Sequence, residues 1–352
     1  MINLFGAHIN SLSIHRVGNK INNEPIFLSD NIYKADDELT PLLKEYFLKP
    51  FREKEENYFQ FTHESDLEFH ELFSITTKIF DEPNSIHEQS KIITKYLYDQ
   101  SLHPHIKAGE VYIVHFENVQ IDNEKVDAIG IFKSEIKQDF LQFSENKNQL
   151  DIKLEHGVNL NKLDKGCLIF NIKKEDGYKI LSIDSNRYDT RYWLESFLGV
   201  NALEDDNFHT KKYLKFCQDF AKDVVLPAED KKEEVLFMNR AVNHFAKNDA
   251  FQESLFINEV INNPDLVPEF KHYKTEQAPK YKIEDLTEFP IANTAVTAAR
   301  KKIKNIINLD TNIQIKLDFI NSHSADKFVE KGWDEEKQMY YYLVYFNKEH
   351  KA

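Results

Sequence analysis

The chain has few cysteines and few glycines for its length. Of 352 residues, two are cysteines, Cys167 and Cys217, and nine are glycines. Two separated cysteines provide neither a disulfide framework nor a CxxC metal motif, and both positions are typical of buried apolar side chains. The glycines form no GxGxxG, GxxxxGK[ST] or GxSxG motif. The sequence therefore lacks the familiar phosphate-cradling loops and the tight turn that presents a serine nucleophile.

Long apolar runs are also missing. A membrane-spanning helix needs about 18 apolar residues in succession, whereas the stretch from Val111 to Phe116 is already interrupted by His115. The first residues contain no charged segment followed by an apolar one, which is the pattern of a secretion signal. With 41% hydrophobic and 30% charged residues, the composition is typical of a globular protein. We expect a soluble intracellular protein that binds no membrane.

Hydrophobic periodicity predicts an α+β fold in three segments. Residues 1–186 mix helix and strand patterns, and the polar turns between the strands favour a mostly antiparallel sheet. Residues 187–265 have the period of helices, and residues 266–352 are expected to form a small α/β module with a basic helix. Strands are expected at 9–17, 25–33, 110–118, 125–133, 138–144, 150–155, 166–172, 178–184, 313–319 and 338–346. Helices are expected at about 66–80, 84–102, 189–198, 207–226, 228–247, 249–262 and 265–275, with further helical segments after Asp36, after Thr294 and near 324–330.

The last predicted strand is apolar or aromatic on both faces. Residues 338–346 read QMYYYLVYF. Such a strand is typically covered on both sides. The pattern favours a central position in a sheet, with a place in an interface as the alternative, and a homo-oligomer is left open.

Charge is distributed unevenly along the chain. The formal net charge is −14, which a uniformly basic nucleic-acid-binding protein could not have. Residues 1–186 carry 21 basic and 31 acidic groups, whereas residues 266–352 carry 14 and 13. A polyanionic partner would therefore need a local basic patch.

The clearest basic segment lies between Ile291 and Leu309, where there is no acidic residue. Its cations are Arg300, Lys301, Lys302 and Lys304. Near the end of the helix expected after Thr294, they would complement the helix dipole. Alanines keep this helix slim enough to approach a phosphate backbone. The alternative is an ordinary solvated helix end.

A second basic stripe lies on the predicted helix 207–226, opposite its apolar arc. Its lysines are Lys211, Lys215 and Lys222. Asp219 and Asp223 border the stripe, and Lys215 and Asp219 have the i,i+4 spacing of a helical ion pair. A solvated helix face is the alternative here as well.

Catalytic and metal-binding motifs do not emerge. The three His-Glu dipeptides have no histidine four positions after the first, so none forms HExxH. The one plausible ligand cluster is His103–Pro104–His105, with Glu110, His115 and Glu117 nearby in sequence. It leaves a hydrolase as a third interpretation. We expect no enzymatic activity, no metal and no cofactor.

Three segments share a pattern with a known family. They are the strand-like Ile9–Arg16, the stretch 179–199 ending in Phe-Leu-Gly, and the tail from the basic helix through Ile313–Phe319 to the closing aromatic strand. In order and spacing they resemble the bacterial nucleoid-associated proteins called YejK or NdpA. The resemblance implies a cytoplasmic, nucleoid-located protein that binds double-stranded DNA without catalysis or cofactor.

Two hypotheses from different classes follow. The leading one is weak DNA binding without strong sequence specificity, in which the cations at 300–304, aided by those on helix 207–226, contact phosphates. About four such contacts predict a logarithmic salt slope of roughly −3.6. The alternative is that the acidic residues 1–186 dock a basic partner such as a DNA-processing protein, so that association with the nucleoid is indirect.

Overall fold

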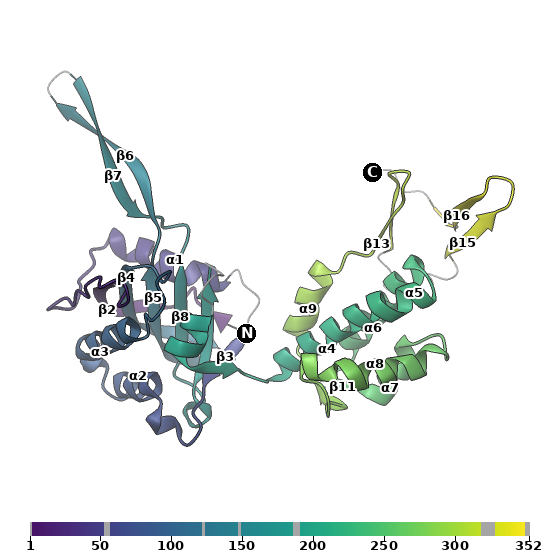
Figure 1. The fold of residues 1–352 in the computed structure, drawn as a ribbon, viewed down its shortest axis with the longest axis horizontal. Coiled ribbons are helices and arrows are strands. Elements are labelled where there is room, and N and C mark those ends of the chain that lie inside the picture. Colours follow the sequence, from purple (N-terminus) through teal and green to yellow (C-terminus); the bar gives the residue numbers. More distant parts are fainter. Residues whose placement is uncertain are drawn as a thin grey trace. The chain divides into compact units, whose positions relative to one another are not determined.

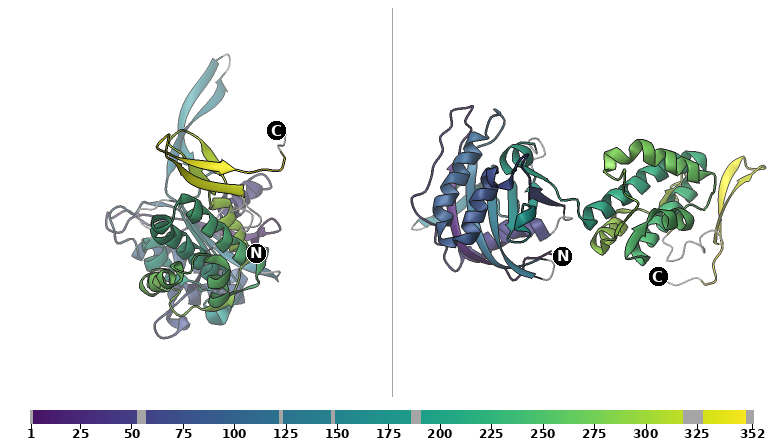
Figure 2. Two further views of the ribbon diagram at one scale, coloured as in Figure 1. Left: turned by 90° about the vertical axis from the view of Figure 1, so that its right-hand side faces the viewer. Right: turned by 90° about the horizontal axis from the view of Figure 1, so that it is seen from below.

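The computed structural model describes residues 2–52, 57–121, 124–146, 149–185, 191–317 and 328–348. Its contacts divide the chain into two compact units, Met1–Leu203 and Glu204–Ala352, which are drawn in Figure 1 and Figure 2. The sequence pattern predicts changes at 186 and 265, whereas the contacts divide the chain after Leu203. Helices on both sides of 265 lie in one unit because their apolar side chains share one core.

The N-terminal unit is built on an antiparallel sheet. The strands that form this sheet among the described residues are β1 (Ile2–Asn3), β2 (His8–Val17), β3 (Tyr58–Phe61), β4 (Gly109–Ile121), β5 (Glu124–Ser134), β8 (Lys165–Phe170), β9 (Lys179–Asp184) and β10 (Val200–Ala202). They pair in the order β1-β4-β5-β8-β9-β3-β10, and β2 also pairs with β4. The mixed α+β class expected from the sequence is confirmed.

Apolar side chains cover both faces of this sheet. Helices α2 (Glu71–Asp81) and α3 (Ile86–Asp99) pack on one face, and α1 (Leu39–Arg52) packs on the other. On β4, Ile113 belongs to the first core and Val114 to the second, because successive strand residues point to opposite faces. Short 3₁₀ turns complete the unit: η1 (Leu67–Phe69), η2 (Pro83–Ser85) and η3 (Lys174–Asp176).

A two-stranded arm, β6 (Lys137–Asn146) and β7 (Gln149–Val158), stands apart from the main sheet. Figure 1 shows it projecting from the N-terminal unit. Every described residue of β6 is exposed. The strands predicted at 138–144 and 150–155 are present, but they pair with each other in a separate sheet.

The C-terminal unit packs helices around an aromatic core. Its helices are α4 (Asp206–Phe220), α5 (Leu226–Ala228), α6 (Lys231–Lys247), α7 (Glu253–Val260), α8 (Leu266–Tyr281) and α9 (Asn293–Lys302), with a π-helical turn η6 (Ala221–Val225) between α4 and α5. Asp205 and Asp230 begin α4 and α6 by accepting hydrogen bonds from backbone N–H groups. In the core, the Phe251 ring stacks on Phe245 and Phe289. Phe251 and Phe289 lie on β11 (Ala250–Gln252) and β12 (Glu288–Pro290), which pair with each other.

Two small hairpins follow α9, and they correct one prediction. They are β13 (Ile306–Asn308) with β14 (Gln314–Lys316), and β15 (Val329–Asp334) with β16 (Met339–Val344). The expectation that 338–346 is a central strand is wrong: among the described residues β16 pairs with β15 alone, and all of its residues except the half-buried Tyr342 are exposed. An apolar pattern on both faces of a strand does not show what covers those faces. Of the residues of β16, only Tyr342 packs on a small apolar cluster, formed by Val235, Ile307, Leu317 and Val329.

Some other predicted elements differ from the structure or lie partly outside the described residues. Residues 25–33 form isolated backbone pairs, through Phe27 and Tyr33, in place of a strand. Of the helix predicted at 189–198, the described part is a π-helical segment, η5 (Tyr192–Leu198), and residues 186–190 lie outside the described residues. The helical turn predicted near 324–330 and the end of strand 313–319 fall largely in 318–327, also outside them.

Both cysteines are buried, as the sequence predicts. Burial raises the pKa of the Cys167 thiol to about 12, and it raises the pKa of Cys217 as well. Both thiols are therefore protonated and unreactive at neutral pH. Among the described residues, no helix combines the length and the apolar character that crossing a membrane requires.

Candidate nucleic-acid interface

Helix α9 presents the acid-free basic segment. Its alanines favour helix, and Ala295 and Val296 are buried against the rest of the unit. Its beginning is fixed by the Ala292 N–H, which donates to Thr210 Oγ1 on α4 at 3.0 Å. The helix ends at Ile303, where the backbone becomes extended. These contacts leave the last turn of α9 at the surface.

The four cations at this end are all exposed: Arg300, Lys301, Lys302 and Lys304. Arg300 Nη2 donates to Asn243 Oδ1 on α6 at 3.1 Å. A guanidinium has five N–H donors, so this neutral contact orients Arg300 without neutralising it. The cations also face the partial negative charge of the helix C-terminus, which stabilises α9.

The lysines on α4 and the π-helical turn have a different environment. Lys215 Nζ donates to Asp219 Oδ1 at 2.7 Å, so the i,i+4 pair expected from the sequence is formed. Lys211 is half-buried and itself has an interaction partner within the protein. Lys222 is exposed on η6. At the end of α9, Lys302 also has an interaction partner within the protein, so the comparison with the stripe rests on Arg300, Lys301 and Lys304.

Asp219 ties this stripe to α8. It accepts from Tyr281 Oη at 2.6 Å and lies 3.9 Å from Lys280 Nζ. Partial burial opposes ionisation of Asp219, but the hydrogen bonds from Lys215 and Tyr281 outweigh it and lower the pKa of this carboxyl. Asp219 is therefore a stable anion at neutral pH, beside the lysines that would meet a phosphate.

The two groups of cations contact different helices. The α9 group is held to α6 through Arg300, whereas the α4 group is held to α8 through Asp219. In Figure 1, α4 and α6 lie between α9 and α8. The α9 cations are exposed on a segment without acidic residues, whereas the α4 group includes the half-buried Lys211 and the paired Lys215. The α9 group is therefore the better-defined candidate of the two.

A groove lies between α7 and α8 in this unit. Its lining mixes both signs of charge: Glu253, Lys271, Lys274, Glu284 and Glu288. Lys274 Nζ, nearly buried, donates to Glu253 Oε2 at 2.7 Å. Because its acids outnumber its lysines, the groove does not favour a polyanion.

The histidines singled out in the sequence form no metal centre. The rings of His103 and His105 lie 5.0 Å apart, while His115 is buried on β4 between Asn10 and Asp127. Across the part of the chain that the structure describes, no three His, Cys, Asp or Glu side chains are arranged to hold a metal ion. No observation on these residues favours the hydrolase interpretation.

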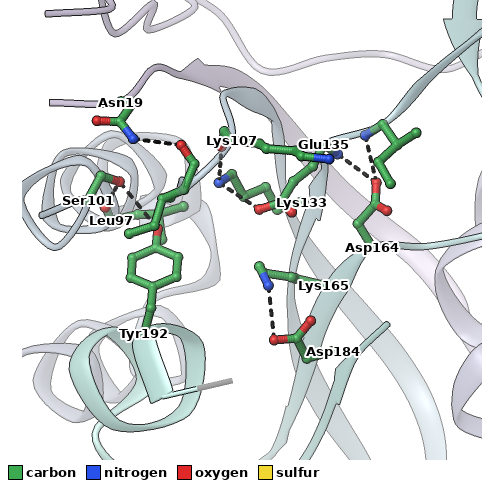
Figure 3. A network of polar contacts seen from close by, with 12 residues as sticks. Asn19, Leu97, Ser101, Lys107, Lys133, Glu135, Asp164, Lys165, Asp184 and Tyr192 are labelled. Carbon is green, nitrogen blue, oxygen red and sulfur yellow. Dashed lines mark hydrogen bonds and ion pairs between the residues drawn. The ribbon is translucent and has the colours of Figure 1, made fainter. Parts of the chain in front are cut away.

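The N-terminal unit contains a buried ionic network that the sequence pattern did not predict. Lys133 on β5 and Lys165 on β8 stand opposite each other in the sheet, and both are at most 1% exposed. Lys133 Nζ donates to Glu135 Oε1 at 2.9 Å and to the Lys107 carbonyl at 2.6 Å, and Lys165 Nζ donates to Asp184 Oδ2 at 2.9 Å (Figure 3). Each buried ammonium therefore has a carboxylate partner.

The network also fixes the neighbouring backbone. Asp164 Oδ2 accepts from the N–H groups of Glu135 and Ile136, at 2.7 and 3.0 Å. Tyr192, the first residue of η5, forms a hydrogen bond with Ser101 at 3.3 Å (Figure 3). The Asp164 contacts hold the segment after β5 to the residue before β8, and the tyrosine contact joins η5 to the segment that follows α3. The sequence feature that could have indicated the network is Lys133, a lysine after an apolar strand pattern. The predicted strand 125–133 simply ends at this residue.

The family model described as nucleoid-associated protein YejK matches residues 13–340, which is nearly the full length and includes both units. No curated protein matches the chain. The match confirms the family resemblance. This chain belongs to the family of the nucleoid-associated protein YejK.

Proposed function

We propose that this protein binds double-stranded DNA directly, weakly and without strong sequence specificity, through the cations at the end of α9. The observation that carries the proposal is the run from Ile291 to Leu309, which has no acidic residue and exposes Arg300, Lys301 and Lys304. Membership of a nucleoid-associated family supports a partner of this class. Binding of this kind requires no catalytic group and no cofactor.

The chemistry is electrostatic. Each phosphate neutralised by Lys or Arg releases counterions, so about four contacts give a logarithmic salt slope of roughly −3.6. The formal net charge of −14 repels DNA from most of the remaining surface. This repulsion orients the protein and limits its affinity. The sequence contains no recognised base-reading motif, so duplexes of unrelated sequence should bind alike.

The test removes the four charges on α9 together. Arg300→Ala, Lys301→Ala, Lys302→Ala and Lys304→Ala are combined, and binding to duplex DNA is measured by fluorescence anisotropy between about 50 and 200 mM salt. We expect the slope to fall towards zero. An unchanged slope in the quadruple variant would overturn this assignment.

The α4 lysines serve as a graded comparison. Because Lys215 already pairs with Asp219, the combined change Lys211→Ala, Lys215→Ala and Lys222→Ala should reduce the slope by about one contact or less. A loss as large as that of the α9 variant would move the main contact to α4.

An indirect route to the nucleoid is the second candidate. The N-terminal unit, residues 1–203, carries 23 basic and 33 acidic groups, a balance that suits a basic protein partner such as a DNA-processing enzyme. The full-length protein is purified from lysate with and without nuclease treatment. A reproducible partner that survives nuclease and also binds the α9 quadruple variant would support this route. Loss of all partners with nuclease would exclude it.

A further inference from the structure

The β6–β7 arm segregates its side chains onto two faces. Residues paired across the strands lie on the same face, and successive pairs alternate between faces. One face therefore carries five large apolar side chains, each between 55% and 66% exposed: Leu141, Phe143, Leu150, Ile152 and Leu154. We call these five residues the arm stripe.

The opposite face of the arm is polar. Gln142 stands beside Lys153, and Ser144 beside Asp151. The one large apolar side chain here, Phe140, lies over Gly157, where an added Cβ would come within 2.8 Å of the ring. Phe140 is 51% exposed, but it is a single apolar side chain on a polar face, whereas the arm stripe joins five.

We propose that the arm stripe is a dimerisation surface that packs face to face on the arm of a second copy of this chain. A two-stranded ribbon is at best marginally stable in water unless something covers its apolar face. Segment 137–158 contains four acidic residues and three lysines. This charge balance does not favour a nucleic acid or an anionic membrane as the covering partner.

The arm stripe is complementary to itself under a two-fold rotation. With the axis between the Leu141–Leu154 pair and the Phe143–Ile152 pair, each leucine pair packs on the other copy's aromatic–aliphatic pair. The apolar side chains at the centre of the arm stripe then cover one another.

The area is sufficient for a specific contact. Five large side chains that are more than half exposed present about 500 Å² per copy, so two copies bury about 1000 Å² in total, near the lower limit for a specific interface. The proposal is independent of DNA binding, because the arm belongs to the N-terminal unit and the α9 cations belong to the other.

The test compares the two faces of the arm in the full-length protein. Sedimentation equilibrium is measured for the wild type, Phe143→Lys on the arm stripe, and Phe140→Lys on the opposite face. We expect a wild-type dimer, a dissociation constant raised at least about thirtyfold by Phe143→Lys, and a much smaller change for Phe140→Lys. Circular dichroism checks that both variants keep the fold.

Every other outcome would contradict the proposal that the arm stripe is the dimer contact. A wild type that stays monomeric at 100 μM, as a rough upper concentration for a specific dimer, would overturn the proposal. Dimers that persist in Phe143→Lys would place the contact elsewhere, and equal losses in both variants would remove the assignment to one face.

Cross-linking gives a second, positive readout. Both native cysteines are buried, so an introduced thiol reacts alone. A short bismaleimide should link two copies of Ile152→Cys efficiently and two copies of Lys153→Cys poorly, because neighbouring strand residues point to opposite faces. Equal yields at the two positions would contradict a face-to-face contact.

Discussion

Lysine occupies opposite extremes in the two units. Lys133 and Lys165 are almost fully buried at one end of the N-terminal sheet, each with a carboxylate at 2.9 Å. Lys301 and Lys304, at the end of α9, are exposed in a segment without acidic residues. The comparison shows that the surroundings of a lysine, more than its presence, decide whether its charge is available to a partner.

The free-energy cost of carrying a positive charge differs between the buried and the exposed lysines. Burial lowers the pKa of Lys133, while the charge of Glu135 opposes this shift. Taking the ammonium out of water is costly, so such a pair stabilises a fold mainly by penalising arrangements that separate its members. An exposed cation bears no such cost and keeps its long-range attraction for phosphate, although salt screens it.

The largest expected effect comes from breaking a buried pair. Asp184→Asn leaves the Lys165 ammonium without its carboxylate at 2.9 Å, and we expect it to lower the free energy of unfolding by about 3 kcal/mol or more. Urea denaturation measures the change. The double change Lys165→Met with Asp184→Leu is the matched control, because it removes both charges and should cost clearly less. If the two variants lose the same free energy of unfolding, lost packing, and not the unpaired charge, explains the effect.

Acid should destabilise the N-terminal unit next most strongly. Burial and then the nearby His87 lower the pKa of His15 from 6.5 to about 4. His15 Nδ1 accepts the Ser29 N–H at 3.0 Å, so the neutral ring, protonated on Nε2, fits its partners. Burial likewise lowers the pKa of His70, whose Nδ1 accepts the Phe73 N–H.

The sign of the pH dependence follows from these shifts. Each folded pKa is below its unfolded value, so this stability is fully present above about pH 6.5 and is lost as the pH falls towards 4. For His15 we expect a loss of roughly 2 kcal/mol. Thermal unfolding between pH 7 and 4.5 measures it. The variant His15→Gln with His70→Asn should flatten the dependence, and a slope equal to the wild type's would refute this cause.

The smallest effect on stability is expected at the end of α9. Arg300→Ala removes one exposed hydrogen bond to Asn243, so the free energy of unfolding should change by about 0.5 kcal/mol or less. The same change should reduce the DNA salt slope by about 0.9. A large loss of stability would mean that Arg300 is mainly structural, and the contrast between the two units would weaken.

The sequence predicted the regular elements that bury an apolar face. Strand alternation located β4, β5 and β9, and apolar spacing located α3 and α6, because each of these elements has a core against one side. Periodicity failed where a pattern was apolar but the covering surface lay outside the element. For this reason β16 was assigned to the middle of a sheet, and β6–β7 was not recognised as a separate arm.

Charged residues were harder to place from sequence. The exposed α9 cluster was visible as a segment free of acids. The Lys133–Lys165 network was not, because it depends on the register between β5, β8 and β9, which brings together residues far apart in the chain. Strand register is a tertiary property. The i,i+4 pair between Lys215 and Asp219 was predictable because one helix contains both partners.

The most direct test of the central claim compares two variants of equal net charge. One lacks the four α9 cations; the other combines Lys34→Ala, Lys78→Ala, Lys95→Ala and Lys125→Ala, four lysines that are exposed in the N-terminal unit. Both lose four positive charges, so any difference in DNA binding reports position. We predict that the control keeps the wild-type logarithmic salt slope of roughly −3.6, while the α9 variant approaches zero. Equal slopes in the two variants would contradict the claim that DNA is contacted at the end of α9.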